Sequence, residues 1–270
     1  MHISDIAKEK IKLIAADLDG TLLNSNKEIS EYNQKIIKKL INKYNIDFIL
    51  SSGRPYEGIK NYNEILENNN LSIIFNGASI ADNDGNIIFR KTLDEEASKQ
   101  IIELSKKYDV CLHVYDNGKY IVSKENFPIK SYVQIENKVN VIAGLENIND
   151  YRFDKMLILG ERDILEKLKE EIDSLNCVHT CFSGTLFLEA VNKEANKGNA
   201  LKKICEIKKI DIKDTIAFGD NFNDIEMIEY SGIGVAMGNA EENVKQKADY
   251  IALSNEEDGV GKFLSSIFSI

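Results

Sequence analysis

The chain has 270 residues, of which 43% are hydrophobic and 29% are charged, a composition typical of a globular protein with one large or two modest domains. Its net charge of −10 and pI near 5.0 argue against binding to nucleic acid or to an anionic membrane surface through bulk charge, although a local basic pocket is compatible with them. Because no long uncharged apolar run is present and residues 1–12 lack the apolar core of a signal peptide, we expect a cytoplasmic protein without a membrane span.

The first eighty residues alternate between short apolar runs and amphipathic runs. We predict strands at 11–17, 47–51 and 72–75, a helix capped by Ser30 that runs to about Tyr44, and a second helix that begins at Pro55. Strands that alternate with helices pair in parallel through right-handed crossovers, so this part predicts a parallel α/β sheet.

In the middle of the chain, the strict alternation of strands and helices gives way to predicted hairpins. Asp84-Gly85 and Asn117-Gly118 are hairpin signals between short extended runs. We predict helices at 94–107, 128–138 and 162–174, and strands at 111–114, 120–122, 155–159 and on both sides of 183–185. This block, 82–188, is expected to form a separate α+β unit with a largely antiparallel sheet.

After the middle block, predicted strands and helices alternate again as they do in the first eighty residues. We predict helices at 198–206, from about Asn223 and at 240–247, and strands at 215–219, 232–237 and 249–253. The sequence therefore predicts one discontinuous α/β domain, residues 1–81 and 189–270, interrupted by an inserted α+β domain at 82–188.

Two carboxylates follow the first predicted strand. In Asp17-Leu18-Asp19-Gly20-Thr21 they are one residue apart, so both can converge at the carboxyl end of the strand, where open α/β sheets form their binding crevices. Converging carboxylates repel each other unless a cation or a proton neutralises them, and with no His or Cys nearby the cation expected is Mg²⁺. The ordinary alternative is a strand that ends in a glycine turn with solvated acids.

Three further segments place polar groups where a strand ends or a helix begins: Ser52-Gly53, Lys197-Gly198, and the run from Gly219 to Asp224. Each has an ordinary explanation, since Ser52 can cap a turn, exposed lysines are common and helix-start acids are often solvated. In one crevice, however, carboxylates with Mg²⁺, a hydroxyl and an ammonium are what a phosphoryl group requires.

Four cysteines occur, and two of them, Cys177 and Cys181, flank His179. A zinc site could use these residue types, but no second cluster accompanies them, so we expect ordinary reduced thiols.

Taken together, the motifs resemble the haloacid dehalogenase superfamily of phosphatases, and the inserted block with Glu257-Asp258-Gly259-Val260 resembles its Cof-type branch, the subclass IIB sugar phosphatases. The resemblance covers nearly the whole chain. It implies an α/β fold with a Rossmann-like parallel-sheet core and an inserted cap domain of the C2B type. It also implies a mobile cap with hinges at 76–78 and 188–194.

The resemblance also implies roles for individual residues. Asp17 would be the nucleophile that becomes an aspartyl-phosphate, and Asp19 would act as general acid and then as general base. The residues implied as Mg²⁺ ligands are Asp17, Asp19 through its backbone carbonyl, Asp220 and Asp224. The residues implied to hold the phosphate are Leu18 through its backbone, Ser52, Gly53, Lys197 and Asn223. Two positions depart from the family pattern: Ser52 stands where Thr is common, and the turn before Lys197 is unusual, which leaves Lys193 as an alternative.

We therefore predict a Mg²⁺-dependent phosphatase for a small phosphorylated metabolite, such as a sugar phosphate, acting as a monomer or homodimer. The alternatives are a hexose phosphomutase, which shares the aspartyl-phosphate chemistry, and a non-catalytic phospho-acceptor module. Substrate selectivity is expected from the inserted block, where the candidates by polarity are Arg90, His113, Tyr115, Lys119 and Tyr120.

Overall fold

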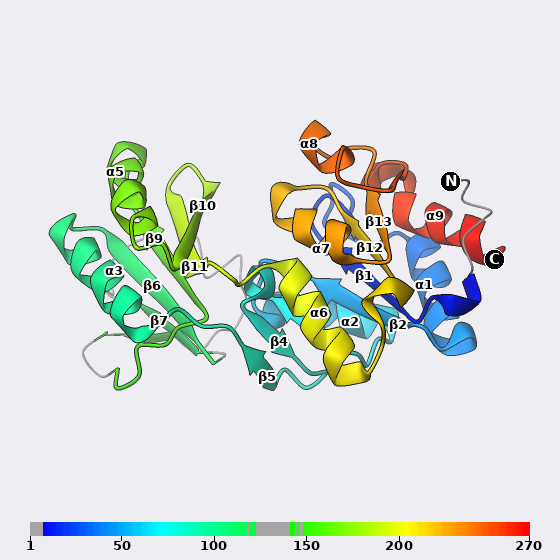
Figure 1. Cartoon of the computed structure of the whole chain (residues 1–270), viewed down its shortest axis with the longest axis horizontal. Coiled ribbons are helices and arrows are strands. Elements are labelled where there is room, and N and C mark those ends of the chain that lie inside the picture. Colours follow the sequence, from blue (N-terminus) through cyan, green and yellow to red (C-terminus); the bar gives the residue numbers. More distant parts are fainter. Residues whose placement is uncertain (1–7, 118, 123–140, 144, 146–147) are drawn as a thin grey trace. The chain divides into compact units, whose positions relative to one another are not determined.

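The computed structural model describes residues 8–117, 119–122, 141–143, 145 and 148–270. The chain divides into two compact units, Met1–Asn86 with Asn196–Ile270, and Ile87–Ala195 (Figure 1). Each unit is described by itself. Among the described residues, we find no helix whose length and apolar content would suffice to span a bilayer.

Both unit boundaries fall later in the chain than the predicted 81/82 and 188/189, and local hydrogen bonds explain why. Asp82 closes its own turn, because its carboxylate accepts hydrogen bonds from the backbone N–H groups of Asp84 and Asn86. At the other boundary, the strand that contains residue 189 continues to Asn192, which is in register with Val178 of the neighbouring strand. The turn therefore stays with the first unit and the strand with the second.

The first unit is built on a sheet in which β1 is central. The strands are β1 (Leu13–Asp17), β2 (Asp47–Ser51), β3 (Ser72–Ile74), β4 (Ser79–Ala81), β12 (Thr215–Gly219), β13 (Ile233–Ala236) and β14 (Tyr250–Ile251). Their order within this unit is β14-β13-β12-β1-β2-β3-β4, and all neighbours are parallel except β3 and β4. This confirms the predicted α/β class with a parallel-sheet core.

Helices cover both faces of this sheet. They are α1 (Glu31–Tyr44), α2 (Lys60–Leu66), α6 (Lys197–Lys208), α7 (Ile225–Tyr230), α8 (Glu242–Lys245) and α9 (Gly259–Phe268). The ring of Phe218 on β12 makes an edge contact with Phe263 of α9, with centroids 5.5 Å apart. On β13, Gly234 lies against Ile228 of α7, and its register partner is Ala217. Because residues 217 and 218 point to opposite faces of a strand, α7 and α9 lie on opposite sides, with α6 beside α7 and α1 beside α9 (Figure 1).

Three predicted boundaries of the first unit are wrong. The third strand ends at Ile74 rather than 75, because Phe75 and Asn76 adopt left-handed backbone conformations, with φ of 52° and 55°. The helix predicted from Pro55 begins as the short 3₁₀ helix Tyr56–Gly58, and α2 starts only at Lys60. The last strand is only Tyr250–Ile251. Helix α1 does begin as predicted, with the Ser30 hydroxyl accepting from the Asn33 N–H at 3.1 Å.

The second unit has its own sheet and its own core. Its elements are β5 (Ile87–Arg90), α3 (Glu95–Lys107), β6 (Cys111–Asp116), β7 (Lys119–Val122), β8 (Val141–Ala143), β9 (Lys155–Leu159), α5 (Arg162–Asp173), β10 (Val178–Gly184) and β11 (Phe187–Asn192). The sheet order is β10-β11-β9-β6-β7-β8, antiparallel except between β7 and β8, as expected for an α+β unit. The predicted helix 128–138 lies outside the described residues.

Candidate active site

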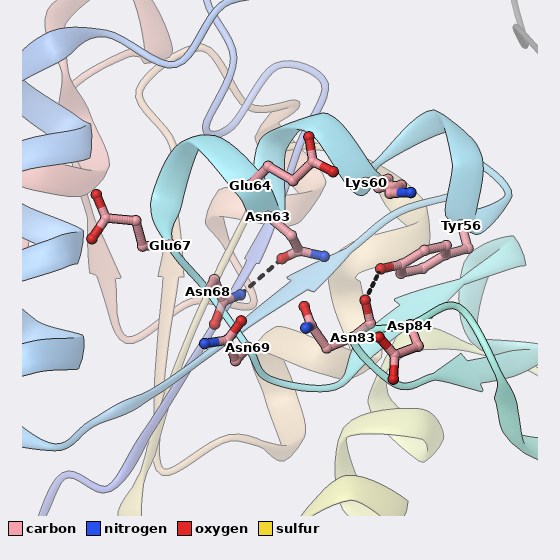
Figure 2. Close-up of a pocket in the computed structure, with 9 residues that line it drawn as sticks. All are labelled: Tyr56, Lys60, Asn63, Glu64, Glu67, Asn68, Asn69, Asn83 and Asp84. Carbon is pink, nitrogen blue, oxygen red and sulfur yellow. Dashed lines mark hydrogen bonds between the residues drawn. The ribbon is translucent and has the colours of Figure 1, made fainter.

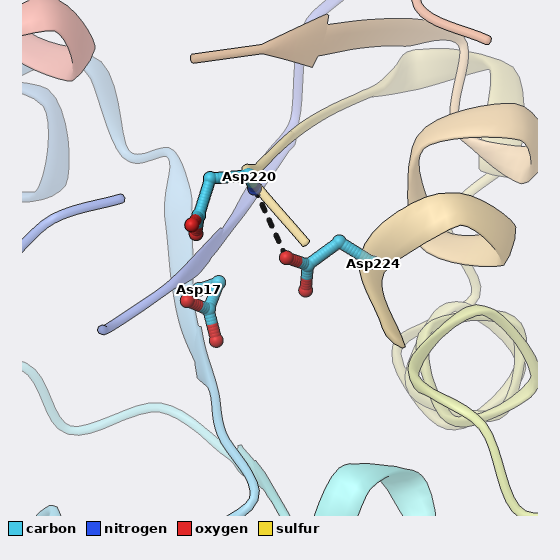
Figure 3. Close-up of side chains that lie close together, drawn as sticks. All are labelled: Asp17, Asp220 and Asp224. Atoms are coloured by element: carbon cyan, nitrogen blue, oxygen red, sulfur yellow. Dashed lines mark hydrogen bonds between the residues drawn. The ribbon is translucent and has the colours of Figure 1, made fainter. Parts of the chain in front are cut away.

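Three carboxylates from separate segments meet at the carboxyl end of β1. Asp17 is the last residue of β1, Asp220 follows β12 directly, and Asp224 lies in the short 3₁₀ helix Phe222–Asp224. One oxygen from each lies within 4.8 Å of the others, and Figure 3 shows the three side chains converging. Asp224 also fixes its own loop, since its Oδ2 accepts from the N–H groups of Asp220 and Asn221 at 3.0 and 3.1 Å.

A buried lysine joins two of these carboxylates. The side chain of Lys197, the first residue of α6, is fully buried. Its Nζ donates to Asp17 Oδ1 at 2.5 Å and to Asp224 Oδ1 at 2.6 Å. Asn196 caps this helix end by accepting from the Asn199 N–H at 2.7 Å. Since Lys193 is exposed, the structure places Lys197, and not the sequence alternative Lys193, among the carboxylates.

The electrostatics of this cluster favour a bound cation. Burial raises the pKa of Asp17 well above its ordinary value, although Lys197 opposes that rise. Burial and then the charge of Asp224 raise the pKa of Asp220 to about 6. For Lys197, burial would lower the pKa, but Asp17 and Asp224 outweigh it and the pKa is raised. The crowded carboxylates thus carry more negative charge than one lysine neutralises. Their oxygens are the donor type that Mg²⁺ prefers, so the residues fit that ion.

Gly20 and Thr21 explain why Asp220 can approach β1. Gly20 has a φ of +84°, and a Cβ on this residue would lie 2.3 Å from Asp220 Oδ2. The Thr21 hydroxyl donates to Asp220 Oδ1 at 2.8 Å. Sequence reasoning gave Thr21 no role of its own, although its place directly after Asp-x-Asp-Gly is a usable signal. A glycine is required here by both backbone conformation and space.

The side chain of Asp19 is engaged elsewhere. It pairs with Arg54, whose Nη2 lies 2.7 Å from Oδ1 and whose Nε lies 2.9 Å from Oδ2. Lys27 Nζ also donates to Oδ1, at 2.8 Å. Burial would raise the pKa of Asp19, but the hydrogen bonds and charges of Arg54 and Lys27 together hold this pKa below its usual value. Sequence reasoning quoted Arg54 within the second motif but gave neither Arg54 nor Lys27 a role, because only the fold shows which carboxylate they reach.

The predicted phosphate-binding residues lie on the loops that surround β1. Ser52 follows β2, is almost fully buried, and its hydroxyl accepts from the Arg54 N–H at 3.2 Å. A Cβ on Gly53 would lie 2.9 Å from Asn76 Oδ1. Asn223 is exposed, and its side-chain amide donates to the same Asn76 oxygen at 2.9 Å. Asn76, which sequence reasoning had placed only in a hinge, therefore links two of the predicted phosphate-binding loops.

The remaining predicted backbone group is that of Leu18. Its side chain is buried, and its carbonyl accepts from the N–H groups of Thr21, Leu22 and Leu23 at 3.3, 3.1 and 2.9 Å. The turn after β1 is therefore closed around Leu18, which keeps the two carboxylates of this motif in fixed backbone positions.

A cavity of about 560 Å³ lies in the same unit, and none of the predicted site residues lines it (Figure 2). Its lining residues are mostly polar: Tyr56, Lys60, Asn63, Glu64, Glu67, Asn68, Asn69, Asn83 and Asp84. The amides of Asn63 and Asn68 bond to each other at 2.9 Å, and the Tyr56 hydroxyl donates to the carbonyl of Asn83. Because these groups satisfy one another, we assign the cavity no part in the chemistry.

In the second unit, the structure gives the surroundings of three of the five polar candidates, Arg90, His113 and Tyr115. Arg90 pairs with Asp154 and Asp116, each at 2.7 Å. His113 and Tyr115 are buried on β6, and burial lowers the pKa of His113 to about 4. Lys119 and Tyr120 lie on β7. The ion pairs of Arg90 hold the unit together, and a role of the five residues in selectivity stays a prediction.

Comparison with known proteins agrees with this geometry. A model of haloacid dehalogenase-like hydrolases matches residues 14–264. A 5-amino-6-(5-phospho-D-ribitylamino)uracil phosphatase of Bacillus subtilis is 33% identical over 253 residues, covering 93% of this chain and 94% of the relative.

Two solved structures have the same fold over nearly their whole length. A haloacid dehalogenase-like hydrolase from Bacteroides thetaiotaomicron has a TM-score of 0.82 at 31% identity, covering 96% of this chain and 100% of that one. A protein from Thermotoga maritima has a TM-score of 0.84 at 31% identity, covering 94% and 97%. The match across the sequence, the fold and the carboxylate cluster shows that the chain belongs to the haloacid dehalogenase-like hydrolases.

Proposed function

We propose that the protein is a Mg²⁺-dependent phosphatase that hydrolyses small phosphomonoesters, such as sugar phosphates, through an aspartyl-phosphate on Asp17. The observation that carries this proposal is the convergence of Asp17, Asp220, Asp224 and Lys197 at the end of β1. A carboxylate nucleophile beside an ammonium and a cation-binding cluster suits phosphoryl transfer, where charge on the phosphate oxygens must be neutralised.

The carboxylates of Asp17, Asp220 and Asp224, with the backbone carbonyl of Asp19, would hold the Mg²⁺. When bound, the ion neutralises charge on the transferring phosphoryl group and on the crowded carboxylates. The raised pKa values of Asp17 and Asp220 support this assignment, because burial and the neighbouring carboxylates make their ionised forms costly and a bound cation would offset that cost.

The reaction then divides into two displacements. An oxygen of Asp17 attacks phosphorus while the bond from phosphorus to the ester oxygen breaks, and Asp19 gives its proton to the departing alkoxide. In the second step Asp19 takes a proton from water, the water oxygen attacks phosphorus, and the bond to Asp17 breaks to release inorganic phosphate. Both steps need Asp19 to leave its present partners, Arg54 and Lys27.

The phosphate oxygens would be held by Lys197, the Ser52 hydroxyl, Asn223 and the backbone N–H groups of Leu18 and Gly53. Lys197 supports this role best, because its ammonium already lies on Asp17, the residue that would carry the phosphoryl group. The second unit would serve as the cap that contributes substrate contacts.

The substrate class is supported by the Bacillus relative, whose name describes a phosphorylated ribityl pyrimidine. That molecule is a small phosphomonoester with a polyol chain, in keeping with a sugar phosphate or a related metabolite. We propose cytoplasmic activity on such metabolites, without a nucleic-acid or membrane partner, by a monomer or homodimer.

Replacement of Asp17 by Asn tests the proposal. With Mg²⁺ and an aryl phosphate, we expect Asp17→Asn to lose about 10³-fold or more in turnover. The control Asp214→Asn removes a carboxylate that pairs with Lys12 at 2.8 Å, outside the cluster, and should retain activity. Rapid quenching followed by mass spectrometry should find a phosphorylated chain in the wild type and not in Asp17→Asn. Full activity of Asp17→Asn would refute the mechanism, whereas isomerisation of a hexose phosphate without phosphate release would favour a mutase.

A further inference from the structure

Two cations converge on the single carboxylate of Asp19. Arg54 forms a bidentate ion pair with the two Asp19 oxygens, at 2.7 and 2.9 Å, and Lys27 donates a third hydrogen bond at 2.8 Å. The three side chains together carry one more positive than negative charge. They are also open to a ligand, since the side chains of Lys27 and Asp19 are 60% and 40% exposed and that of Arg54 is 29% exposed.

The Arg54 guanidinium and the Lys27 backbone are held by groups other than Asp19. The Tyr62 hydroxyl donates to the Lys27 carbonyl at 3.0 Å, and the Arg54 guanidinium lies 5.7 Å from the centre of the Tyr62 ring. Arg54 Nη1 also donates to the Gly58 carbonyl at 3.3 Å. The backbone of Lys27 is left-handed, with φ of 61°, and its N–H donates to the Asn24 carbonyl at 2.9 Å. The Arg54 guanidinium and the backbone that carries Lys27 would therefore keep these contacts if Asp19 turned away.

This arrangement conflicts with the role proposed for Asp19. An acid or base must contact the ester oxygen or the attacking water, but both oxygens of Asp19 are already bonded to cations. If Asp19 left alone, two neighbouring cations would lose their shared anion. A second anion in the place of Asp19 would keep both cations paired. The planar guanidinium of an arginine can bind a carboxylate or a phosphate through two parallel hydrogen bonds.

We propose that Lys27 and Arg54 form an anion subsite for the leaving group, so that the preferred substrates are phosphomonoesters that carry a second anionic group, a carboxylate or another phosphate. Binding of that group replaces Asp19 on the two cations and frees Asp19 for proton transfer. The proposal rests on the phosphatase function proposed above and specifies its substrate class.

Competitive inhibition of aryl phosphate hydrolysis by a matched pair of compounds tests this subsite. Glycerol 3-phosphate and 3-phosphoglycerate are three-carbon phosphomonoesters that differ by one carboxylate. We expect 3-phosphoglycerate to have an inhibition constant about tenfold lower in the wild type. We expect Lys27→Gln to abolish most of this preference and Lys27→Arg to retain it, since a hydrogen bond to a charged group commonly accounts for a tenfold change.

The control is Lys38→Gln, which removes the charge of a partly exposed lysine that pairs with Glu67 at 2.7 Å and not with Asp19. It should keep the wild-type preference. Equal inhibition constants in the wild type, or an unchanged ratio in Lys27→Gln, would overturn the subsite. Because the aryl phosphate has no second anion, its turnover reports on the phosphatase function separately. An active enzyme without the preference therefore refutes only the anion subsite.

Discussion

Lys197 lies between two carboxylates, with its ammonium 2.5 Å from Asp17 and 2.6 Å from Asp224. All three side chains are buried, and they come from β1, from the first turn of α6 and from the loop after β12. An ammonium in this position restrains the carboxylate proposed to attack phosphorus and balances part of the charge around it. Several measurable properties depend on that relationship.

Replacement of Lys197 by Met should destabilise the Mg²⁺-free protein by about 3–5 kcal/mol, because it leaves Asp17 and Asp224 buried without their cation. Added Mg²⁺ should recover part of this loss, since a cation in the cluster takes over the neutralisation. Thermal unfolding with and without Mg²⁺ measures both effects. The matched control Lys193→Met changes an exposed lysine four residues earlier and should unfold like the wild type. Equal unfolding of the two variants would contradict the pairing.

Replacement of Asp220 by Asn should change stability in opposite directions with and without Mg²⁺. The pKa of Asp220 is raised from 3.8 to about 6, so at pH 7 its ionised carboxylate is less favourable in the folded state than in the unfolded state, where water solvates it. A neutral Asn removes this cost and should stabilise the Mg²⁺-free chain by about 1 kcal/mol, or roughly 2–4 °C in Tm. The same change removes a proposed ligand, so Mg²⁺ should no longer raise Tm as it does in the wild type.

The stability gained by Asp220→Asn should depend on pH in a direction that only a raised pKa of Asp220 explains. The cost is present above pH 6 and fades as the pH falls from about 6 toward 3.8, because Asp220 is then protonated in the folded state first. The advantage of Asp220→Asn should therefore shrink at pH 5. An advantage that grows on acidification would show that the pKa of Asp220 is not raised.

Replacement of Gly20 by Ala should reduce both stability and activity. The left-handed backbone costs a non-glycine residue about 1–2 kcal/mol, and the new methyl group would meet the Asp220 carboxylate at 2.3 Å. Gly85→Ala is a useful control, because Gly85 has a similar φ of +87° but faces the Tyr56 ring instead. Both variants should unfold more easily, and only Gly20→Ala should lose tenfold or more in kcat/KM with an aryl phosphate. Equal activities would mean that Gly20 serves only the backbone turn.

His113 should make the stability of the second unit depend on pH. Burial lowers its pKa from 6.5 to about 4, so the unfolded chain takes up a proton at a higher pH than the folded chain does. Stability is therefore fully present above pH 6.5 and falls as the pH drops from 6.5 toward 4. The expected loss between pH 7 and pH 5 is about 2 kcal/mol.

The His113→Gln variant isolates that contribution. Its unfolding free energy should fall by about 2 kcal/mol less than that of the wild type between pH 7 and pH 5, as measured by urea titration. His179→Gln, which changes an exposed histidine of the same unit, should follow the wild type. A pH dependence that is unchanged in His113→Gln would mean that this imidazole does not titrate as its burial requires.

Local pattern was enough to predict most elements of the fold. The parallel core was predicted from buried apolar strands that alternate with helices, and β1, α1 and β12 lie close to where they were expected. The errors occur where a contact distant in the sequence, or an unusual backbone angle, ends an element. The third strand is an example: the left-handed backbone of Phe75 ends β3 one residue early, and the conformational preference of Phe does not predict that backbone.

The sequence by itself determined the class of fold, the family and the identity of the carboxylates, because these depend on periodicity and on residues adjacent in the chain. Only the tertiary structure decided that Lys197 rather than Lys193 reaches Asp17, and that Arg54 and Lys27 hold Asp19. The physical reason is that the partner of a charged side chain is set by distance and burial. Both are properties of segments brought together from far apart in the chain.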